Sequence, residues 1–164
     1  MDTYKINIEG LDRELRKFPV NDKLDIAAFI MFGDIEMTEV AARELLKRVP
    51  EHDVVVTAEA KGIPLCYEMA RQGCRNYVVA RKSVKVYMGN PIGVTVNSIT
   101  TKNEQKLYLG EDDVISTGES LHALETLVEK TGANIVGRAS VLAEGDAKDR
   151  DDIIFLSELP LFFK

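Results

Sequence analysis

The sequence predicts an α/β fold with a mostly parallel, twisted sheet and helices on both faces of that sheet. Two short apolar runs, 53–58 and 76–80, are typical of strands that are covered on both faces. Between them, a helix is predicted from Ile63 to Gln72, with Pro64 in its first turn and Gly73 just beyond its end. A strand, a helix and a strand in this order favour a right-handed crossover and parallel pairing.

The chain is expected to form one domain over residues 1–164, because this length suffices for a sizeable core. The first 36 residues are predicted to be irregular. Apolar residues recur at helical spacing over 37–49, and Pro50 ends that segment. A helix is therefore expected shortly before the first buried strand.

A hairpin is predicted after the second buried strand. Residues 89–93 contain the turn-forming residues glycine, asparagine and proline, and the flanks 84–88 and 94–99 have strand character. A hairpin that projects from a compact domain is often a lid over a site. We therefore expect a hairpin lid over approximately 83–104.

A second series of alternating elements follows the hairpin. A strand is predicted around 107–109, and after a short polar turn a helix is predicted over 120–131, closed by Gly132. Further strands are predicted at 134–143 and 152–156. This series should extend the parallel sheet and place helices on both of its faces.

Composition excludes several classes of function. The net charge of −6 argues against a nucleic-acid or anionic-membrane surface. The sequence has no apolar run of the roughly 20 residues that a membrane span needs, and its N-terminus lacks the pattern of a signal peptide, so a cytoplasmic location is expected. Cys66 and Cys74 lack CxxC spacing, and His52 and His122 lack an HExxH context, which argues against a disulfide or a zinc site.

Two adjacent acids, Asp112 and Asp113, follow the strand at 107–109 and precede a small polar turn. That turn contains Ser116, Thr117, Gly118, Glu119 and Ser120. Free backbone N–H groups and the helix dipole favour a phosphate at a turn between a strand and a helix. Carboxylates beside it suit hydroxyl groups, so the stretch predicts a sugar-phosphate site. The alternative is an ordinary helix N-cap beside solvated turn acids.

Two further loops, 59–62 and 81–85, also follow predicted strands. The first consists of Glu59, Ala60, Lys61 and Gly62, and the second adds the cations Arg81, Lys82 and Lys85. The carboxyl ends of strands in a doubly wound sheet share one rim, where ligands bind. These cations would suit a pyrophosphate, although a solvated sheet edge is the alternative.

Together these motifs resemble the type I phosphoribosyltransferase family, closest to adenine phosphoribosyltransferase and related purine enzymes. Residues 112–120 resemble the family's phosphoribosyl-pyrophosphate motif, in which Asp-Asp precedes Thr-Gly-Gly-Thr. Residues 59–62 resemble the pyrophosphate loop, which is usually Glu-Ala-Arg-Gly in adenine enzymes. Residues 80–82 resemble the start of the catalytic lid, and 32–35 resemble part of a base-covering hood. The resemblance runs over roughly residues 20–145.

The resemblance implies an enzyme of purine salvage. It would transfer phosphoribose from phosphoribosyl pyrophosphate to a purine base, with adenine as the expected base, and release pyrophosphate. Asp112 and Asp113 would bind the ribose hydroxyls and, indirectly through ribose or water, Mg²⁺. The turn 116–120 would hold the 5′-phosphate, and Lys61 and Arg81 would stabilise the departing pyrophosphate.

The resemblance also implies a hood formed by approximately residues 1–36 and the C-terminal tail. Phe29 and Phe32 are the candidates for contact with the base. Members of the family often pair as homodimers, so a cytoplasmic homodimer that binds neither nucleic acid nor membrane is expected.

Two departures from the family pattern leave alternatives open. Glu119 stands where a second glycine is usual, and only Gly110 and Glu111 separate the 107–109 strand from Asp112. Family members usually have a separate apolar strand before the two acids. These departures favour a non-catalytic regulator that binds phosphoribosyl pyrophosphate. A structural α/β subunit that binds no such ligand is the third possibility.

Overall fold

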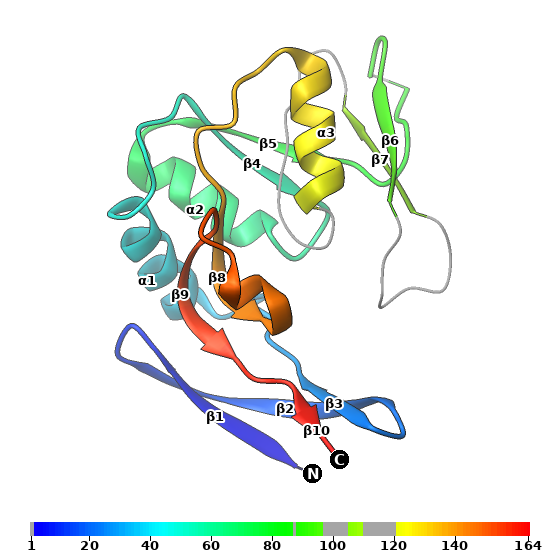
Figure 1. The fold of residues 1–164 in the computed structure, drawn as a ribbon. Coiled ribbons are helices and arrows are strands. Elements are labelled where there is room, and N and C mark those ends of the chain that lie inside the picture. Colours follow the sequence, from blue (N-terminus) through cyan, green and yellow to red (C-terminus); the bar gives the residue numbers. More distant parts are fainter. Residues whose placement is uncertain (1, 87, 97–104, 110–120) are drawn as a thin grey trace. The chain divides into compact units, whose positions relative to one another are not determined.

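The computed structural model describes residues 2–86, 88–96, 105–109 and 121–164 (Figure 1). The chain divides into two compact units. The first unit comprises residues 1–49 together with 137–164, and the second comprises residues 50–136. None of the helices in the described part of the chain is long and apolar enough to cross a membrane.

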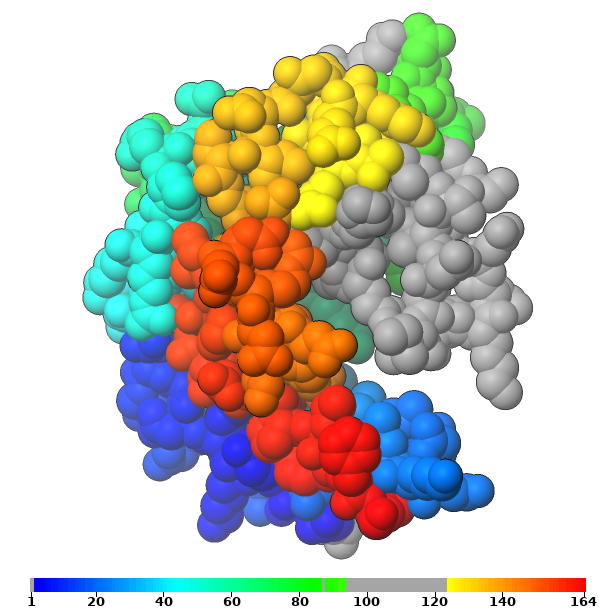
Figure 2. All heavy atoms as spheres, viewed as in Figure 1, coloured from blue at the N-terminus to red at the C-terminus, as the bar shows by residue number. Residues whose placement is uncertain are grey.

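A four-stranded antiparallel sheet dominates the first unit. Its strands are β1 (Thr3–Ile8), β2 (Leu11–Asn21), β3 (Leu24–Ala27) and β10 (Phe162–Phe163), in the order β1-β2-β3-β10. The C-terminal residues, drawn in red, therefore lie beside β3 of the same unit (Figure 2). The prediction that residues 1–36 are irregular is wrong.

A two-residue turn connects the first two strands of this sheet. Glu9 and Gly10 both have positive φ, at 50° and 88°, and they connect Ile8 directly to Leu11 in the ladder. Such turns match the twist of paired strands and favour glycine. The Asn7 carboxamide also accepts a hydrogen bond from the Gly10 N–H at 3.0 Å. Arg13 and Lys17 occupy inward positions of β2 between exposed charged residues, so the sequence lacks the alternation of apolar and polar residues that would indicate a strand.

The rest of the first unit is a helix against two parallel strands. Helix α1 (Ile35–Leu46) contacts β8 (Ala139–Glu144) and β9 (Ile154–Leu159), and a short 3₁₀ helix η1 (Gly145–Asp149) lies between those strands. The buried residues of α1 form the helical stripe expected from sequence; they are Met37, Thr38, Ala41, Ala42 and Leu45. The predicted helix and both predicted C-terminal strands are present, with boundaries shifted by a few residues.

In the second unit, β4 (Val54–Ala58), α2 (Ile63–Gly73) and β5 (Asn76–Ala80) form the predicted strand–helix–strand unit. The strands are parallel, and Ala58 pairs with Ala80 at their carboxyl ends. Cys74, the C-cap residue that follows α2, adopts the left-handed conformation with φ 52°. Parallel pairing and the connecting helix are thus confirmed for this part of the chain.

Helix α3 (Leu121–Thr131) and helix α2 cover opposite faces of the β4–β5 pair. Leu124 and Leu127 pack in one buried cluster with Ala58 and Ala80 at the strand ends. Residues one position earlier in each strand point to the other face, since side chains alternate along a strand. Helix α2 contacts both strands, and its Tyr67 packs edge-to-face on Tyr77 of β5 with ring centroids 5.8 Å apart. The prediction of helices on both faces is confirmed for this pair.

A hairpin is present in this region, but it pairs residues 92–96 with 105–109 rather than 84–88 with 94–99. Strand β6 (Ile92–Val96) pairs antiparallel with β7 (Gln105–Leu109), and the described residues of 84–88 form no strand. The Met88 N–H instead donates to the Lys85 carbonyl at 3.0 Å, which closes a turn. Alternation of apolar residues identifies strand character but cannot choose between two equally alternating partners.

The expectation that residues 107–109 belong to the parallel sheet is also wrong, because β7 is the second strand of that hairpin. Among the described strands, parallel pairing is limited to β4–β5 and β8–β9. The fold is therefore α/β, with more antiparallel pairing than the sequence predicts.

Candidate active site

The loops 59–62 and 81–85 lie next to each other, as predicted. Each follows the carboxyl end of a strand, and those strands, β4 and β5, are neighbours in parallel register. Parallel strands deliver the loops that follow them to one edge of the sheet. The structure therefore brings two of the three predicted loops together. The third predicted loop, 111–120, lies outside the described residues.

Glu59 joins the two loops through three contacts. Its backbone N–H donates to the Ala80 carbonyl at 2.9 Å. Its carboxylate accepts a hydrogen bond from the Lys82 N–H at 2.9 Å and forms an ion pair with Arg81, with 2.7 Å between Nε and Oε1. The peptide bond between Glu59 and Ala60 is cis. One acidic residue thus fixes the backbone on both sides of the site.

The amino end of α2 lies at the end of the same loop. Gly62 is its N-cap residue and contributes no side-chain hydrogen bond to the first turn, and Pro64 occupies one of the first helical positions. The Ile63 N–H donates to the Ala60 carbonyl at 3.2 Å and Pro64 has no N–H, so the partial positive charge at this end comes from the helix dipole. Loop 59–62 is therefore favourable for an anion on electrostatic grounds.

Basic side chains surround this edge of the sheet. Lys61 and Lys82 are exposed, and the Lys85 ammonium donates to the Ser83 hydroxyl at 2.8 Å. The side chain of Arg81 remains 34% exposed in its ion pair with Glu59. The edge carries more positive than negative side chains, and arginine and lysine suit phosphate oxygens.

The other predicted site residues fall in the segment that the structure does not describe. These are Asp112, Asp113, Ser116, Thr117, Gly118, Glu119 and Ser120. Their roles, including indirect contact with Mg²⁺, stay predictions. Elsewhere in the chain, the described residues contain no group of three or more histidine, cysteine or acidic residues that could hold a metal ion.

The two predicted base-contact residues belong to the first unit. Phe29 is half-buried, whereas the Phe32 side chain is 54% exposed. Both lie in the connection between β3 and α1. Their contact with a base stays a prediction.

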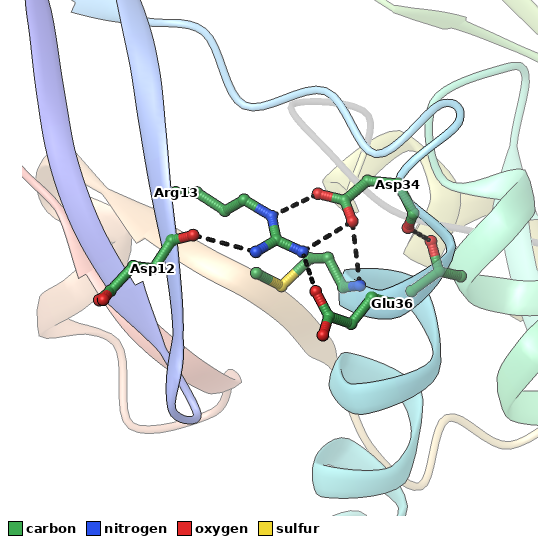
Figure 3. A network of polar contacts seen from close by, with 6 residues as sticks. Asp12, Arg13, Asp34 and Glu36 are labelled. Atoms are coloured by element: carbon green, nitrogen blue, oxygen red, sulfur yellow. Dashed lines mark hydrogen bonds and ion pairs between the residues drawn. The ribbon is translucent and has the colours of Figure 1, made fainter.

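Sequence reasoning missed Arg13, which forms the network in Figure 3. Its guanidinium contacts both carboxylate oxygens of Asp34, with Nε–Oδ2 at 2.6 Å and Nη2–Oδ1 at 2.9 Å. It also contacts Glu36 and the Asp12 carbonyl, each at 2.9 Å. Hydrogen bonding to the guanidinium lowers the pKa of Asp34. A charged residue between Leu11 and Leu15 on the inner face of β2 was the available signal, since partly buried charges need partners.

The two cysteines are both free thiols, and Cys66 is buried while Cys74 is exposed. Burial raises the pKa of the Cys66 thiol to about 12, so the thiol stays protonated at neutral pH. A protonated, buried thiol is a poor nucleophile and metal ligand. Cys66 therefore serves packing in α2.

Known proteins resemble this chain in sequence, although no protein-family model matches it. A hypoxanthine/guanine phosphoribosyltransferase from Methanococcus voltae is 31% identical over 158 residues, which cover 85% of this chain and 83% of that protein. An adenine phosphoribosyltransferase from Rhodococcus jostii is 31% identical over 124 residues, covering 68% and 69%. The purine biosynthesis transcriptional repressor PurR of Bacillus subtilis is 29% identical over 111 residues, covering 60% of this chain and 39% of the repressor.

Solved structures share the fold. Adenine phosphoribosyltransferase from Thermoanaerobacter pseudethanolicus superposes with a TM-score of 0.68 at 19% identity, covering 88% of this chain and 95% of that one. The enzyme from Trypanosoma brucei, solved with AMP, pyrophosphate and ribose-5-phosphate, gives a TM-score of 0.62 at 17% identity, covering 86% and 73%. The sequence relatives, the shared fold and the adjoining basic loops agree with the motifs found in the sequence, and the chain belongs to the type I phosphoribosyltransferase family.

Proposed function

We propose that this protein transfers phosphoribose from phosphoribosyl pyrophosphate to a purine base, with adenine as the base. The products would be the nucleoside monophosphate and pyrophosphate, as in purine salvage. The observation that carries the proposal is the pair of basic loops that Glu59 joins at the carboxyl ends of β4 and β5. An exposed lysine, a helix amino end and an arginine at one edge suit a pyrophosphate group.

The proposed chemistry divides between the loops. As the bond from ribose C1 to pyrophosphate breaks, positive charge develops on the sugar, as in glycoside cleavage. Asp112 and Asp113 would favour that charge and hold the ribose hydroxyls. Lys61, Lys82 and Arg81 would stabilise the negative charge of the departing pyrophosphate. Amides of residues 116–120 would hold the 5′-phosphate.

Magnesium and the lid belong to the same proposal. Mg²⁺ would neutralise pyrophosphate and ribose oxygens, and Asp112 and Asp113 would reach it indirectly through ribose or water. The hairpin of β6 and β7 is the proposed lid, which would exclude water from the reacting sugar. The protein is further proposed to act as a cytoplasmic homodimer.

The choice of adenine rests on sequence similarity. Residues 59–62 resemble the Glu-Ala-Arg-Gly loop of adenine enzymes, and the Rhodococcus jostii relative is an adenine phosphoribosyltransferase. The Methanococcus voltae relative, matched over more of this chain, is named for hypoxanthine and guanine. The test must therefore compare bases directly.

The test is pyrophosphate release from phosphoribosyl pyrophosphate with magnesium, supplying adenine, hypoxanthine, guanine and xanthine in turn. Release with adenine at the highest kcat/KM is the expected result. Release with hypoxanthine or guanine instead would overturn the choice of base. If protein shown to be folded by circular dichroism released no pyrophosphate with any base, that result would contradict transferase activity.

Two observations favour a second candidate, a regulator that binds phosphoribosyl pyrophosphate without turnover. The chain is similar to the PurR repressor, and Glu119 replaces the usual glycine of the motif. A carboxylate in a phosphate turn opposes phosphate binding by charge repulsion. The regulator would show thermal stabilisation by phosphoribosyl pyrophosphate and no pyrophosphate release, whereas the enzyme shows both.

A further inference from the structure

The four-stranded sheet of the first unit has one face toward the interior of that unit and the other face toward solvent. Ile6, Ile8 and Leu15 lie on the inner face, each no more than 7% exposed, and β1 contacts β9. Glu14 and Arg16, which flank Leu15 in β2, are exposed. Since side chains alternate along a strand, the register assigns the paired residues of the sheet to one of these two faces.

An apolar patch occupies one end of the solvent-facing side. Phe18 pairs directly with Ile26, Phe163 pairs directly with Leu24, and Leu24 and Ile26 lie two positions apart in β3, so the four residues share one face. Phe18 lies three positions from Leu15, which places these residues on the face away from the interior. Phe18 and Phe163 are 43% and 77% exposed. We call these four residues the sheet patch, and contiguous exposed apolar residues of this kind mark a site of interaction.

The short strand β10 fixes the direction of Phe163. The ring of its neighbour Phe162 lies 5.1 Å from the Tyr4 ring, and the Lys17 ammonium lies 4.2 Å from the Phe162 ring centroid. Tyr4 and Lys17 belong to the inner face, because they alternate with the exposed residues of β1 and β2. Phe162 therefore holds β10 from the inside, and Phe163 points to the solvent side.

Opposite charges flank the sheet patch at both ends. Arg16 and Glu14 precede Phe18 by two and four positions on the same face of β2. Beyond the other end, the turn between β2 and β3 carries Asp22 and Lys23, both exposed. Within the described part of the chain, neither the Arg16 guanidinium nor the Asp22 carboxylate has a hydrogen-bond or ion-pair partner. Two unpaired charges of opposite sign therefore lie on the two sides of one apolar surface.

We propose that the sheet patch is the contact surface of a dimer, in which a second copy of this chain packs the same face about a twofold axis that crosses β2 near Pro19. Such a contact is self-complementary, because each residue meets the symmetry-related surface of the other copy. Three positions separate Pro19 from Arg16 on one side and from Asp22 on the other. Arg16 of each copy would thus lie opposite Asp22 of the other, on either side of the two apolar patches.

The charge pattern favours a second copy over other occupants of this face. Charges of opposite sign at equal distances from one point are what a face needs to complement itself under twofold symmetry. Glu14 and Lys23 add a second pair of opposite sign in the same arrangement. The net charge of −6 disfavours an anionic membrane as the occupant.

The size of the face suits a weak dimer. Strand β2 has 11 residues, which at about 3.3 Å per residue gives a length of about 36 Å. Three strands spaced about 4.8 Å apart cover about 14 Å, so the face offers roughly 500 Å² per copy. The dimer would bury about 1,000 Å² in total, which is the lower limit for a specific interface. A Kd in the micromolar range is therefore expected.

The first test measures the mass of the full chain by sedimentation velocity over about 1 to 300 µM protein. Phe18→Glu and Phe163→Glu should each weaken self-association at least about tenfold, because each places a carboxylate in an apolar contact. Tyr67→Glu is the matched control, since Tyr67 is 50% exposed on α2 and lies outside the sheet patch. It should leave the Kd within about twofold. Circular dichroism checks that every variant is folded.

The second test exchanges the two flanking charges. Arg16→Asp and Asp22→Arg should each weaken the dimer about tenfold, because each brings like charges together across the axis. The double variant should recover a Kd within about threefold of wild type, since it restores opposite charges with their positions exchanged. Recovery of this kind requires that the two residues meet between copies.

Both tests are independent of turnover, so the proposed transferase can fail while this interface stands. A wild-type chain that is monomeric at every concentration would overturn the proposal. Self-association that survives Phe18→Glu and Phe163→Glu, or that Tyr67→Glu weakens equally, would overturn it too. A double charge variant that stays as weak as either single variant would contradict the twofold arrangement. If a larger oligomer forms, its mass should fall by half in Phe18→Glu, and an unchanged mass would count against the proposal.

Discussion

At the scale of single residues, Glu59 carries the geometry of the basic loops. Its backbone and its carboxylate hold residues on the neighbouring strand end, and its side chain is 24% exposed. Glu51 offers a comparison at the other end of β4, since it pairs with Arg75 but its side chain is 89% exposed. Both ion pairs join a glutamate to an arginine, but Glu59 also binds the backbone of the neighbouring strand end.

Truncation of these two acids should have different effects. Glu59→Ala should lower kcat/KM for phosphoribosyl pyrophosphate about tenfold, because both loops lose their common anchor. Glu51→Ala should leave it within about twofold, as exposed pairs contribute little. Steady-state kinetics on both variants provides the comparison. Equal effects would show that Glu59 has no special part in the site.

Asp34 gives a pH-dependent prediction. Its pKa is lowered in the folded chain, so its contribution to stability is present above the pKa of the unfolded chain, about 3.9, and is lost as pH falls through the folded value. Asp34→Asn should destabilise the protein at pH 7. The difference in unfolding free energy between wild type and variant should shrink below about pH 4. Urea unfolding from pH 7 to pH 3 measures it, and a constant difference would contradict the coupling.

At the scale of elements, the sequence predicted helices and the β4–α2–β5 unit well, because their apolar periodicity and their Gly and Pro boundaries are local signals. It failed where the signal was not local. The β1–β2 hairpin was hidden because Arg13 and Lys17 occupy inward positions and interrupt the alternation. The partner predicted for β6 was wrong because the segments on its two sides alternate equally well between apolar and polar residues.

In the candidate site, too, local features could be predicted from the sequence and non-local contacts could not. Loops 59–62 and 81–85 could be placed from the strands that precede them, since parallel strands deliver their following loops to one edge. The pairing of Glu59 with Arg81 could not, because it depends on side-chain geometry across strands. Arg13 and Asp34 are 21 residues apart, and only the folded sheet brings them together.

The β1–β2 turn supplies a prediction for this scale. Gly10 has φ +88°, and an added Cβ would meet nothing within 4 Å, so the cost of Gly10→Ala is conformational rather than steric against neighbours. That cost should be about 1 kcal/mol of unfolding free energy. Gly10→Asn should cost less, since asparagine tolerates left-handed backbone better. Chemical denaturation of the three proteins tests the order, and an alanine variant as stable as wild type would contradict the turn.

At the scale of the whole molecule, the chain combines family membership with a departure at the motif. It matches the Methanococcus voltae enzyme over 83% of that protein's length. Yet β7 ends at Leu109 as the partner of β6, and only Gly110 and Glu111 precede Asp112 in sequence. Turnover therefore decides between an enzyme and a ligand-binding regulator.

The most direct measurement is magnesium-dependent pyrophosphate release from phosphoribosyl pyrophosphate and adenine, by wild type and by Asp113→Asn. We expect turnover by the wild type, loss of that turnover on chelation of magnesium, and a fall of about a thousandfold in kcat for the variant, because the amide cannot stabilise positive charge on ribose. Circular dichroism should show the variant folded. No release by folded wild-type protein with any purine base, or undiminished release by Asp113→Asn, would contradict the account.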